Sequence, residues 1–312
     1  MSVRFVIDFN RKKRLESRRK PVDEKGLFLQ GHNGCSVILV HGLTGTPKEM
    51  NFLAKHLNQK GYSVLCPRLA NHGQPIEILK NTTWQECYQS VRDAFLAITS
   101  INKNDFFFVS GLSIGALLAL LLADEFKGMI AGVSCLSPIL FYDGWNSPWC
   151  RHFLPLVYFA GLKNFFYFKE EPPYGIKNEA IRNLVGQYYK NASLKDMKDV
   201  GRYGYPYYPV ALLYQHHILV KYLIKRLSSI YNPLQLIQAK NDDMSSMKNS
   251  QFIYDNVSSN VKDFVVLENS YHVVSVDQEK EKVGESLDRF FAAIGKKEKL
   301  TREVYALQGK AI

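Results

Sequence analysis

The pentapeptide GLSIG, from Gly111 to Gly115, places a serine between two glycines where a strand-like apolar run gives way to a helix-like one. A glycine in a packed helix costs about 0.5–1 kcal/mol relative to alanine, which indicates that the backbone here does something alanine cannot do. In a sharp strand-to-helix turn, a serine has strained backbone angles, and small residues two positions to either side prevent clashes. The hydroxyl of Ser113 would then project above a sheet edge, where it can act as a nucleophile.

A nucleophilic serine needs a histidine as its base and an acid that orients the histidine. His272 is the strongest candidate base, because VVLENSYHVVS places it in a loop directly after the last expected strand. LQLIQAKNDDMSS offers Asp242 and Asp243 just beyond another strand end, and the residues alone leave open which of them is the acid. The chain order of serine, aspartate and histidine is that of the α/β-hydrolases.

Backbone amides are the expected donors to the oxyanion that forms when a serine attacks a carbonyl. A helix that opens at Ile114 places its first amides and the positive end of its dipole beside the serine. VILVHGLTGTP supplies a second donor, since Gly42 ends a strand and the amide of Leu43 follows it. Each such donor is worth about 2.7–4 kcal/mol. His41 is assigned an orienting role at most.

Short apolar runs alternate with helical patterns from Leu27 onward, which predicts an α/β fold with a mostly parallel sheet flanked by helices. Seven strands are expected, in LFLQG, SVILVHG, YSVLCPR, DFFFVSG, GVSCLSP, PLQLIQA and DFVVLEN. Helices are expected in PKEMNFLAKHLNQKG, TTWQECYQSVRDAFLAITS, IGALLALLLADEF, MKNSQFIYDNVSS and EKEKVGESLDRFFAAIGK. These elements would collect the candidate residues at the carboxyl ends of the strands.

Residues 140–232 interrupt the alternation and hold 21 of the 40 aromatic residues of the chain. So many tyrosines are unusual for an extended core, because buried hydroxyls need hydrogen-bond partners. We expect an inserted helical lid over an aromatic-lined cleft, the usual form of a small-molecule site. The predicted parts are a basic extension at 1–24, a core at 25–139 and 233–296, the lid at 140–232, and a tail at 297–312.

The chain of 312 residues has a net charge of +11, and residues 1–20 hold eight Lys or Arg against two acids. A basic N-terminus of this kind can contact an anionic membrane, and no nucleic-acid-binding module accompanies it, so no nucleic-acid partner is expected. The five cysteines fit neither a disulfide framework nor a zinc site, and no secretory signal or membrane-spanning run is found. These features favour a cytoplasmic location, with peripheral membrane contact as a hypothesis. No metal or organic cofactor is expected.

Five motifs resemble, in order and spacing, those of bacterial carboxylesterases and monoacylglycerol-lipase-like enzymes of the α/β-hydrolase superfamily. They are HGLTGTP, PRLANHG, GLSIG, QAKNDDM and SYHVVSVDQE. The resemblance covers about residues 25–140 and 232–295, and it implies an esterase with a Ser-Asp-His triad and a cap over its acyl pocket. It also implies Asp242 as the acid, three residues after Ala239, with Asp243 second. The substrates it implies are acyl esters of short to medium chain, or monoglycerides.

The expected reaction is hydrolysis of a carboxylic ester through an acyl-enzyme on Ser113, with His272 as the base. The same triad serves thioesterases and lysophospholipases, and these stay open because the lid recognises the leaving group. A ligand-binding protein of the same fold that lacks catalysis is the alternative from another class, and it predicts a broken triad. Dehalogenases and epoxide hydrolases are disfavoured, since they carry an aspartate where this chain has its serine.

Overall fold

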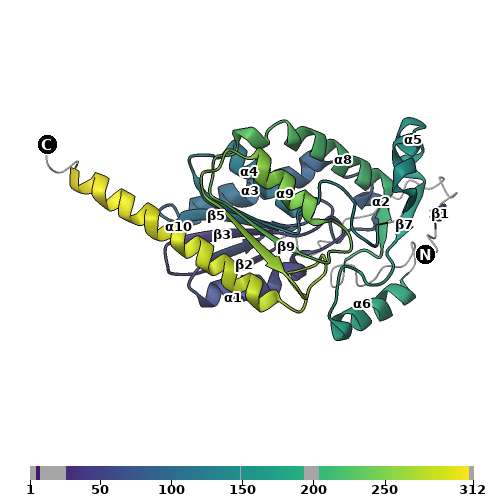
Figure 1. The fold of residues 1–312 in the computed structure, drawn as a ribbon, viewed down its shortest axis with the longest axis horizontal. Coiled ribbons are helices and arrows are strands. Elements are labelled where there is room, and N and C mark those ends of the chain that lie inside the picture. Colours follow the sequence, from purple (N-terminus) through teal and green to yellow (C-terminus); the bar gives the residue numbers. More distant parts are fainter. Residues whose placement is uncertain (1–4, 8–25, 148, 193–203, 309–312) are drawn as a thin grey trace.

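A seven-stranded sheet forms the centre of the protein in the computed structural model, which describes residues 5–7, 26–147, 149–192 and 204–308 (Figure 1). The strands lie in the order β10-β9-β6-β5-β3-β4-β2; β2 is antiparallel to β4, and the other neighbours are parallel. Their bounds are β2 (Leu27–Leu29), β3 (Cys35–Val40), β4 (Ser63–Cys66), β5 (Phe106–Leu112), β6 (Ile130–Leu136), β9 (Leu234–Ala239) and β10 (Lys262–Leu267). All seven expected strands are present, and the predicted fold class is confirmed.

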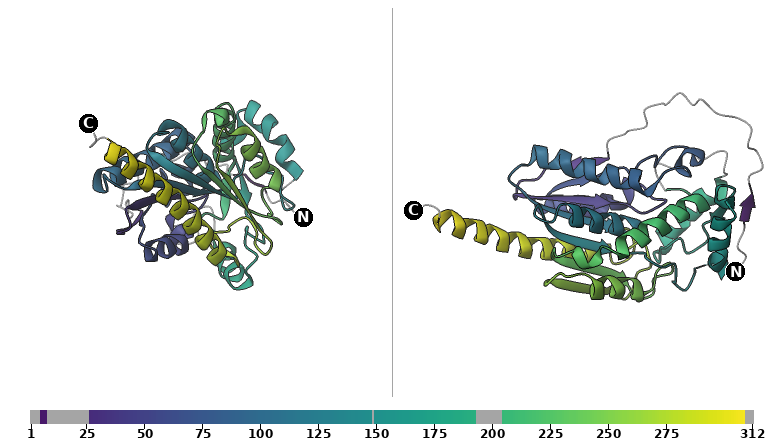
Figure 2. Two further views of the ribbon diagram at one scale, coloured as in Figure 1. Left: turned by 60° about the vertical axis from the view of Figure 1, so that its left-hand side comes forward. Right: turned by 90° about the horizontal axis from the view of Figure 1, so that it is seen from above.

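Helices cover both faces of this sheet, as two further views show (Figure 2). One face carries α1 (Asn51–Gln59) and α10 (Lys280–Gln308), and the other carries four helices. These are α3 (Trp84–Ile101), α4 (Ile114–Glu125), α8 (Val210–Ile224) and α9 (Met247–Asn256). Side chains of successive residues of β3 lie on opposite faces of the sheet. Val37 packs in the core under α1 and α10, and Ile38 packs in the core on the other face.

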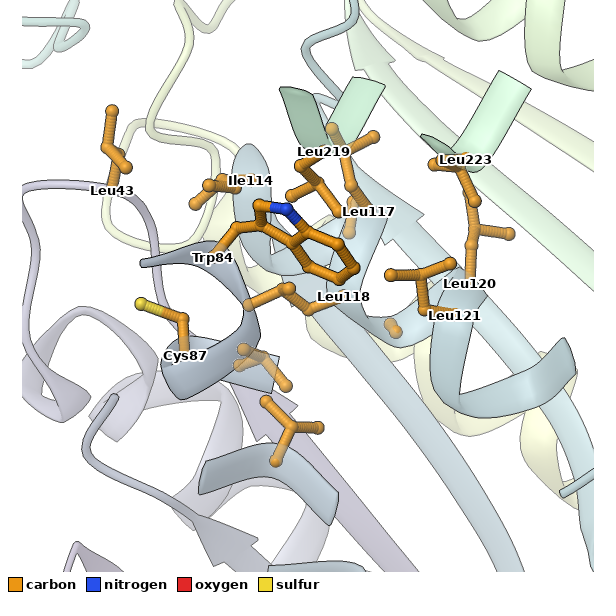
Figure 3. Packing of buried hydrophobic residues seen from close by; sticks show 14 of the residues in the cluster. Leu43, Trp84, Cys87, Ile114, Leu117, Leu118, Leu120, Leu121, Leu219 and Leu223 are labelled. Atoms are coloured by element: carbon orange, nitrogen blue, oxygen red, sulfur yellow. The ribbon is translucent and has the colours of Figure 1, made fainter. Parts of the chain in front are cut away.

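The helix α4 is apolar on all sides and buried along its length. Its residues 114–124 are all buried, as expected for a helix without a polar face. Trp84 of α3 packs beside Leu117 and Leu118, and Leu219 of α8 belongs to the same cluster (Figure 3). The turn that joins β5 to α4 is therefore anchored in the core at both ends.

The insertion between β6 and β9 contributes two strands to a second, three-stranded sheet that the sequence pattern did not predict, and the N-terminal segment contributes the third. In it β7 (Phe166–Lys169) lies between β1 (Phe5–Ile7) and β8 (Tyr207–Pro209), with antiparallel pairing throughout. The longer helices before α8 are α5 (Leu154–Phe159) and α6 (Glu179–Asn191). Apart from β1, the predicted basic extension lies outside the described residues, as do residues 193–203 of the insertion.

Short helices occupy several of the loops between these elements. They are η1 (Pro47–Met50), α2 (Ile76–Leu79), η2 (Trp149–Phe153), η3 (Leu162–Asn164) and η4 (Leu227–Ser229). Within the described ranges, no helix combines the length and the apolar character that crossing a membrane requires.

The C-terminal helix is longer than predicted and projects from the body of the molecule (Figure 1, yellow). The sequence pattern placed its end at Lys296, with a tail beyond, but α10 continues to Gln308. Gly295 does not end the helix; a Cβ there would lie 3.3 Å from the sulfur of Cys35, so the glycine allows close packing on the sheet. The following residues, KKEKLTREVYALQ, contain no glycine or proline and include many strong helix formers.

Candidate active site

Ser113 occupies the turn between β5 and α4 with backbone angles of φ 59° and ψ −119°. Residues other than glycine seldom adopt a positive φ, so the surrounding structure must hold this conformation. The amide of Ser113 donates to the carbonyl of Leu136 on the neighbouring strand at 2.9 Å, and its carbonyl accepts from the amide of Ala116 at 3.1 Å. Both sides of the turn are thus fixed by backbone hydrogen bonds.

The two glycines of the pentapeptide stand where backbone segments approach closely. A Cβ at Gly111 would lie 2.1 Å from the carbonyl oxygen of Gly115, and a Cβ at Gly115 would lie 2.4 Å from that of Val40. Atoms at these separations overlap, so a side chain at either position would displace the turn or the adjacent strand β3. The need for glycine follows from this packing.

The imidazole of His272 links Ser113 to Asp242. Its Nε2 lies 2.9 Å from Oγ of Ser113, and its Nδ1 lies 2.9 Å from Oδ2 of Asp242. These side chains follow β5, β9 and β10, whose carboxyl ends meet at one edge of the sheet. Burial lowers the pKa of His272, but Asp242, together with Asp243 and Glu170, outweighs burial and leaves the pKa above its usual value.

Asp242 is oriented by a set of hydrogen bonds of its own. Oδ1 accepts from the amides of Met244 and Ser245, each at 2.8 Å, and Oδ2 accepts from Nε2 of Gln238 at 2.8 Å. A buried carboxylate with this many donors is fixed in place. It can therefore hold His272 in the tautomer that leaves Nε2 free to accept a proton from the serine.

Asp243 points elsewhere and contacts backbone instead of the imidazole. Its Oδ1 accepts from the amide of His272 at 3.3 Å, and its Oδ2 accepts from the amide of Gly175 in the insertion at 3.1 Å. Burial and the charge of Asp242 raise the pKa of Asp243 to about 6. The geometry therefore separates two adjacent carboxylates whose roles the residues alone left open.

The candidate oxyanion donors lie on the two sides of the serine turn. Leu43 lines the cavity that Ser113 and His272 also line, and Ile114 is the first residue of α4. Across the described part of the chain, the amides of Leu43 and Ile114 donate to no protein acceptor. The side chain of Ile114 is buried in the core beside Trp84, so its backbone is the part that remains available to a ligand (Figure 3).

Two residues that sequence reasoning did not assign to the site hold the Leu43 loop. Oε2 of Glu49 accepts from the amide of Gly42 at 3.1 Å, and Nε2 of His72 lies 2.7 Å from the carbonyl oxygen of Leu43. His41 is fully buried with its ring centroid 4.9 Å from that of His72, which agrees with an orienting role. The sequence signal for Glu49 was its place just after the loop, but the residue was interpreted only as part of the next helix.

A cavity of about 170 Å³ opens beside Ser113 and His272. Its apolar lining includes Ile176, Ile181, Val185, Val273 and Val276, together with Leu43, Leu112 and Met244. A second set of lining residues, called the acidic lining below, consists of the carboxyl groups of Glu49 and Glu170 with the rings of Tyr142, Tyr189 and Tyr208 beside them. Among the residues that the structure describes, no group of His, Cys, Asp and Glu side chains is arranged to hold a metal ion.

A strap, residues 172–178 of the insertion, is bound to the loop that carries the histidine. The buried carboxylate of Asp277 accepts from the amides of Lys177 and Asn178, at 2.9 and 2.8 Å, and from the amide of Tyr271 at 2.7 Å. One side chain thus ties the strap to the residue next to His272. The insertion is therefore part of the support of the site.

The sequence matches a known family and curated relatives over most of its length. The family model described as serine aminopeptidase, S33, matches residues 31–279. A thermostable monoacylglycerol lipase of Bacillus sp. (strain H-257) is 29% identical over 265 residues, which are 85% of this chain and 93% of the relative. A carboxylesterase of Bacillus subtilis (strain 168) is 24% identical over 262 residues, which are 82% of this chain and 91% of the relative. These matches confirm the resemblance drawn from the motifs.

The fold is also similar to that of solved structures. The monoacylglycerol lipase of Paleococcus ferrophilus superposes with a TM-score of 0.69 at 16% identity, over 86% of this chain and 98% of the other. At this identity the likeness bears on the fold alone, and it agrees with the sheet and helix layers described above.

Proposed function

The chain belongs to the family described as serine aminopeptidase, S33, and on this premise we propose that it is a serine hydrolase that cleaves carboxylic esters. We infer carboxylic esters as the substrate class because the relatives are named monoacylglycerol lipase and carboxylesterase. The observation that carries the proposal is the continuous hydrogen-bonded path from Ser113 through His272 to Asp242. A catalytically inactive protein of the same fold would need no such path, and the alternative of a broken triad is disfavoured.

The reaction begins when Oγ of Ser113 attacks the ester carbonyl while Nε2 of His272 accepts the hydroxyl proton. Asp242 stabilises the imidazolium that forms, because its carboxylate lies against Nδ1. The amides of Leu43 and Ile114 donate to the oxyanion, and the removal of one such donor costs about 2.7–4 kcal/mol of transition-state stabilisation. Both amides are available because no protein acceptor in the described ranges engages them.

The second half of the reaction reuses the same groups. The imidazolium of His272 gives its proton to the leaving alcohol, and the acyl group stays on Ser113. His272 then takes a proton from water, and the resulting attack on the acyl carbonyl regenerates the free serine and releases the acid. No step requires a group beyond these side chains, the backbone amides and water.

The cavity favours acyl groups of short to medium length, including those of monoacylglycerol-like lipids. Its apolar lining offers aliphatic side chains to an acyl chain, and its volume of about 170 Å³ is small beside the roughly 300–1,000 Å³ of drug-sized pockets. The insertion 140–232 acts as the lid, since Glu170 and the lining residues Ile176, Ile181 and Val185 come from it. Its strap fixes one side of the lid to the catalytic loop.

We place the protein in the cytoplasm, with peripheral contact to anionic membrane through the basic N-terminus. The support is the excess of Lys and Arg in residues 1–20 and the pairing of β1, within that segment, with β7 of the lid. Binding to vesicles that contain phosphatidylglycerol is expected to weaken when residues 1–20 are deleted. Unchanged binding would remove the N-terminus from this account.

The test of the reaction is hydrolysis of p-nitrophenyl butyrate by wild type and by Ser113→Ala, with Ser110→Ala as the matched control. Ser110 is a buried serine on β5 three residues before the nucleophile, and its hydroxyl makes no hydrogen bond. We expect activity in wild type and in Ser110→Ala, and its loss by several orders of magnitude in Ser113→Ala. Equal activity of the two variants would contradict the proposed reaction.

A further inference from the structure

The acidic lining places two carboxyl groups in the cavity that contains the nucleophile. Oε1 of Glu170 accepts from the hydroxyl of Tyr208 at 3.3 Å, and Oε2 of Glu49 accepts from the amide of Gly42. Neither carboxyl forms an ion pair in the described part of the chain. Lys48 also lines the cavity but is exposed to solvent at its rim. Besides Lys48 at the rim, the basic group that shares the cavity with these carboxyl groups is the imidazole of His272, whose pKa Glu170 helps to raise.

The two carboxyl groups lie close enough to influence each other. Burial raises the pKa of Glu170 to about 8, and the neighbouring Asp243 and Glu49 add to this rise. Burial likewise raises the pKa of Glu49 to about 7. The Glu170 carboxylate is thus disfavoured by desolvation and by like charge, and the Glu49 carboxylate by desolvation. A positive charge in the cavity would relieve these effects.

Aromatic rings complete the same part of the cavity. Tyr142, Tyr189 and Tyr208 line it together with the two glutamates. The face of a tyrosine ring attracts a cation within about 6 Å of its centre, and aromatic walls with nearby carboxylates are the usual surroundings of ammonium ligands. A neutral polyol would use hydrogen bonds alone and would not favour the ionised form of either carboxyl group.

We propose that the acidic lining binds an organic cation, so that the enzyme prefers esters whose alcohol part carries an ammonium group. The apolar lining takes the acyl chain, and this leaves the acidic lining for the alcohol. The proposal names the substrate class of the ester hydrolysis proposed above and rests on it. Glu170 is the main specificity determinant, because Glu49 also holds the oxyanion loop through Gly42.

The test compares butyrylcholine with 3,3-dimethylbutyl butyrate, in which a carbon atom replaces the ammonium nitrogen and the shape is kept. We expect kcat/KM for the choline ester to exceed that for the neutral ester by at least about tenfold in wild type. Glu170→Gln is expected to bring this ratio close to one, and Glu170→Asp, which keeps the charge, to retain most of it. Glu268→Gln is the control, since Glu268 is exposed on the surface and pairs with Lys240; its ratio is expected to equal that of wild type.

A ratio of one or less in wild type, with the neutral ester hydrolysed, would overturn the proposal. A preference for the choline ester that persists in Glu170→Gln would also overturn it. So would a preference for glycerol monobutyrate over the choline ester that depends on Glu170. If no ester is hydrolysed, the proposed ester hydrolysis fails instead. Calorimetry of choline binding to Ser113→Ala then tests separately whether the acidic lining binds an organic cation. Binding that Glu170→Gln weakens by about tenfold or more supports the proposal, and absent binding refutes it.

Discussion

Two stretches of the insertion differ in how they are held, although fewer than twenty residues separate them. The strap 172–178 donates backbone hydrogen bonds to buried carboxylates and packs beside the loop of His272. The stretch Trp149–Phe159 exposes large apolar side chains, with Trp149 at 67% and Phe159 at 92% exposure. The difference indicates that the insertion is divided between support of the loop that carries His272 and presentation of an apolar surface, as an interaction site would require.

The largest loss of activity is expected from substitution of Asp242, the proposed acid, which makes no hydrogen bond to the strap in the described residues. Asp242→Asn should lower kcat by about 10⁴-fold, because an amide at this position favours the wrong tautomer of His272. Asp243→Asn removes a bond to the strap but leaves the imidazole partner, so a much smaller loss is expected. Steady-state kinetics on p-nitrophenyl butyrate measure both, and equal losses would refute the assignment of Asp242 as the acid.

The strap itself is tested by Asp277→Asn, which keeps the size of the side chain but weakens its bonds to three backbone amides. Each bond to a charged group is worth about 1.5–3 kcal/mol, so we expect a clear fall in the melting temperature. Because the loop of His272 loses its anchor, kcat should fall by about ten- to a hundredfold with a smaller change in KM. A destabilised variant with unchanged kcat would separate the strap from the catalytic loop.

The pH dependence of kcat/KM reports the charges around His272. Activity requires the neutral imidazole, so it should rise with pH, and the raised pKa places the midpoint above about 6.5. Because Asp243 contributes to this rise, Asp243→Asn should move the midpoint to lower pH by a fraction of a unit, whereas Phe159→Ser should not move it. A midpoint that moves in Phe159→Ser would contradict the division of the insertion.

The smallest effect on chemistry is expected on the exposed stretch. Phe159→Ser removes an apolar side chain that makes almost no contact with the rest of the molecule, so stability should change by at most about 0.5 kcal/mol. Turnover of a water-soluble ester should be unchanged, while binding to lipid vesicles should weaken. Loss of turnover with the soluble ester would show that this stretch acts on the site.

The parts of the site on the central sheet were accessible from the sequence, and the parts in the insertion were not. Parallel strands collect their carboxyl ends at one edge, so the loops of Ser113, Asp242 and His272 were expected to meet there. The bonds between Asp277 and the strap join residues about a hundred positions apart, and no local pattern encodes them. The small sheet with β7 was missed for the same reason, since its strands are short and pair across long loops.

The resemblance to the family implied Asp242 instead of Asp243, but the physical reason for that choice is visible only in the structure. Both residues follow the same strand end, and a rotation of one residue in the backbone decides which carboxylate faces the imidazole. The amides of Met244 and Ser245 fix that rotation by bonding to Oδ1 of Asp242. Glu170 was missed because its neighbours in sequence, KEEPPYG, are typical of an exposed turn.

The most direct test of the central claim is labelling of the intact protein by a fluorophosphonate, with the modified residue identified by peptide mass spectrometry. An activated serine reacts with this probe, whereas an ordinary buried serine such as Ser110 does not. The account predicts one adduct, on Ser113, that is absent in Ser113→Ala and strongly slowed in His272→Ala. Folded wild-type protein that takes up no label, or that is labelled at another serine, would contradict it.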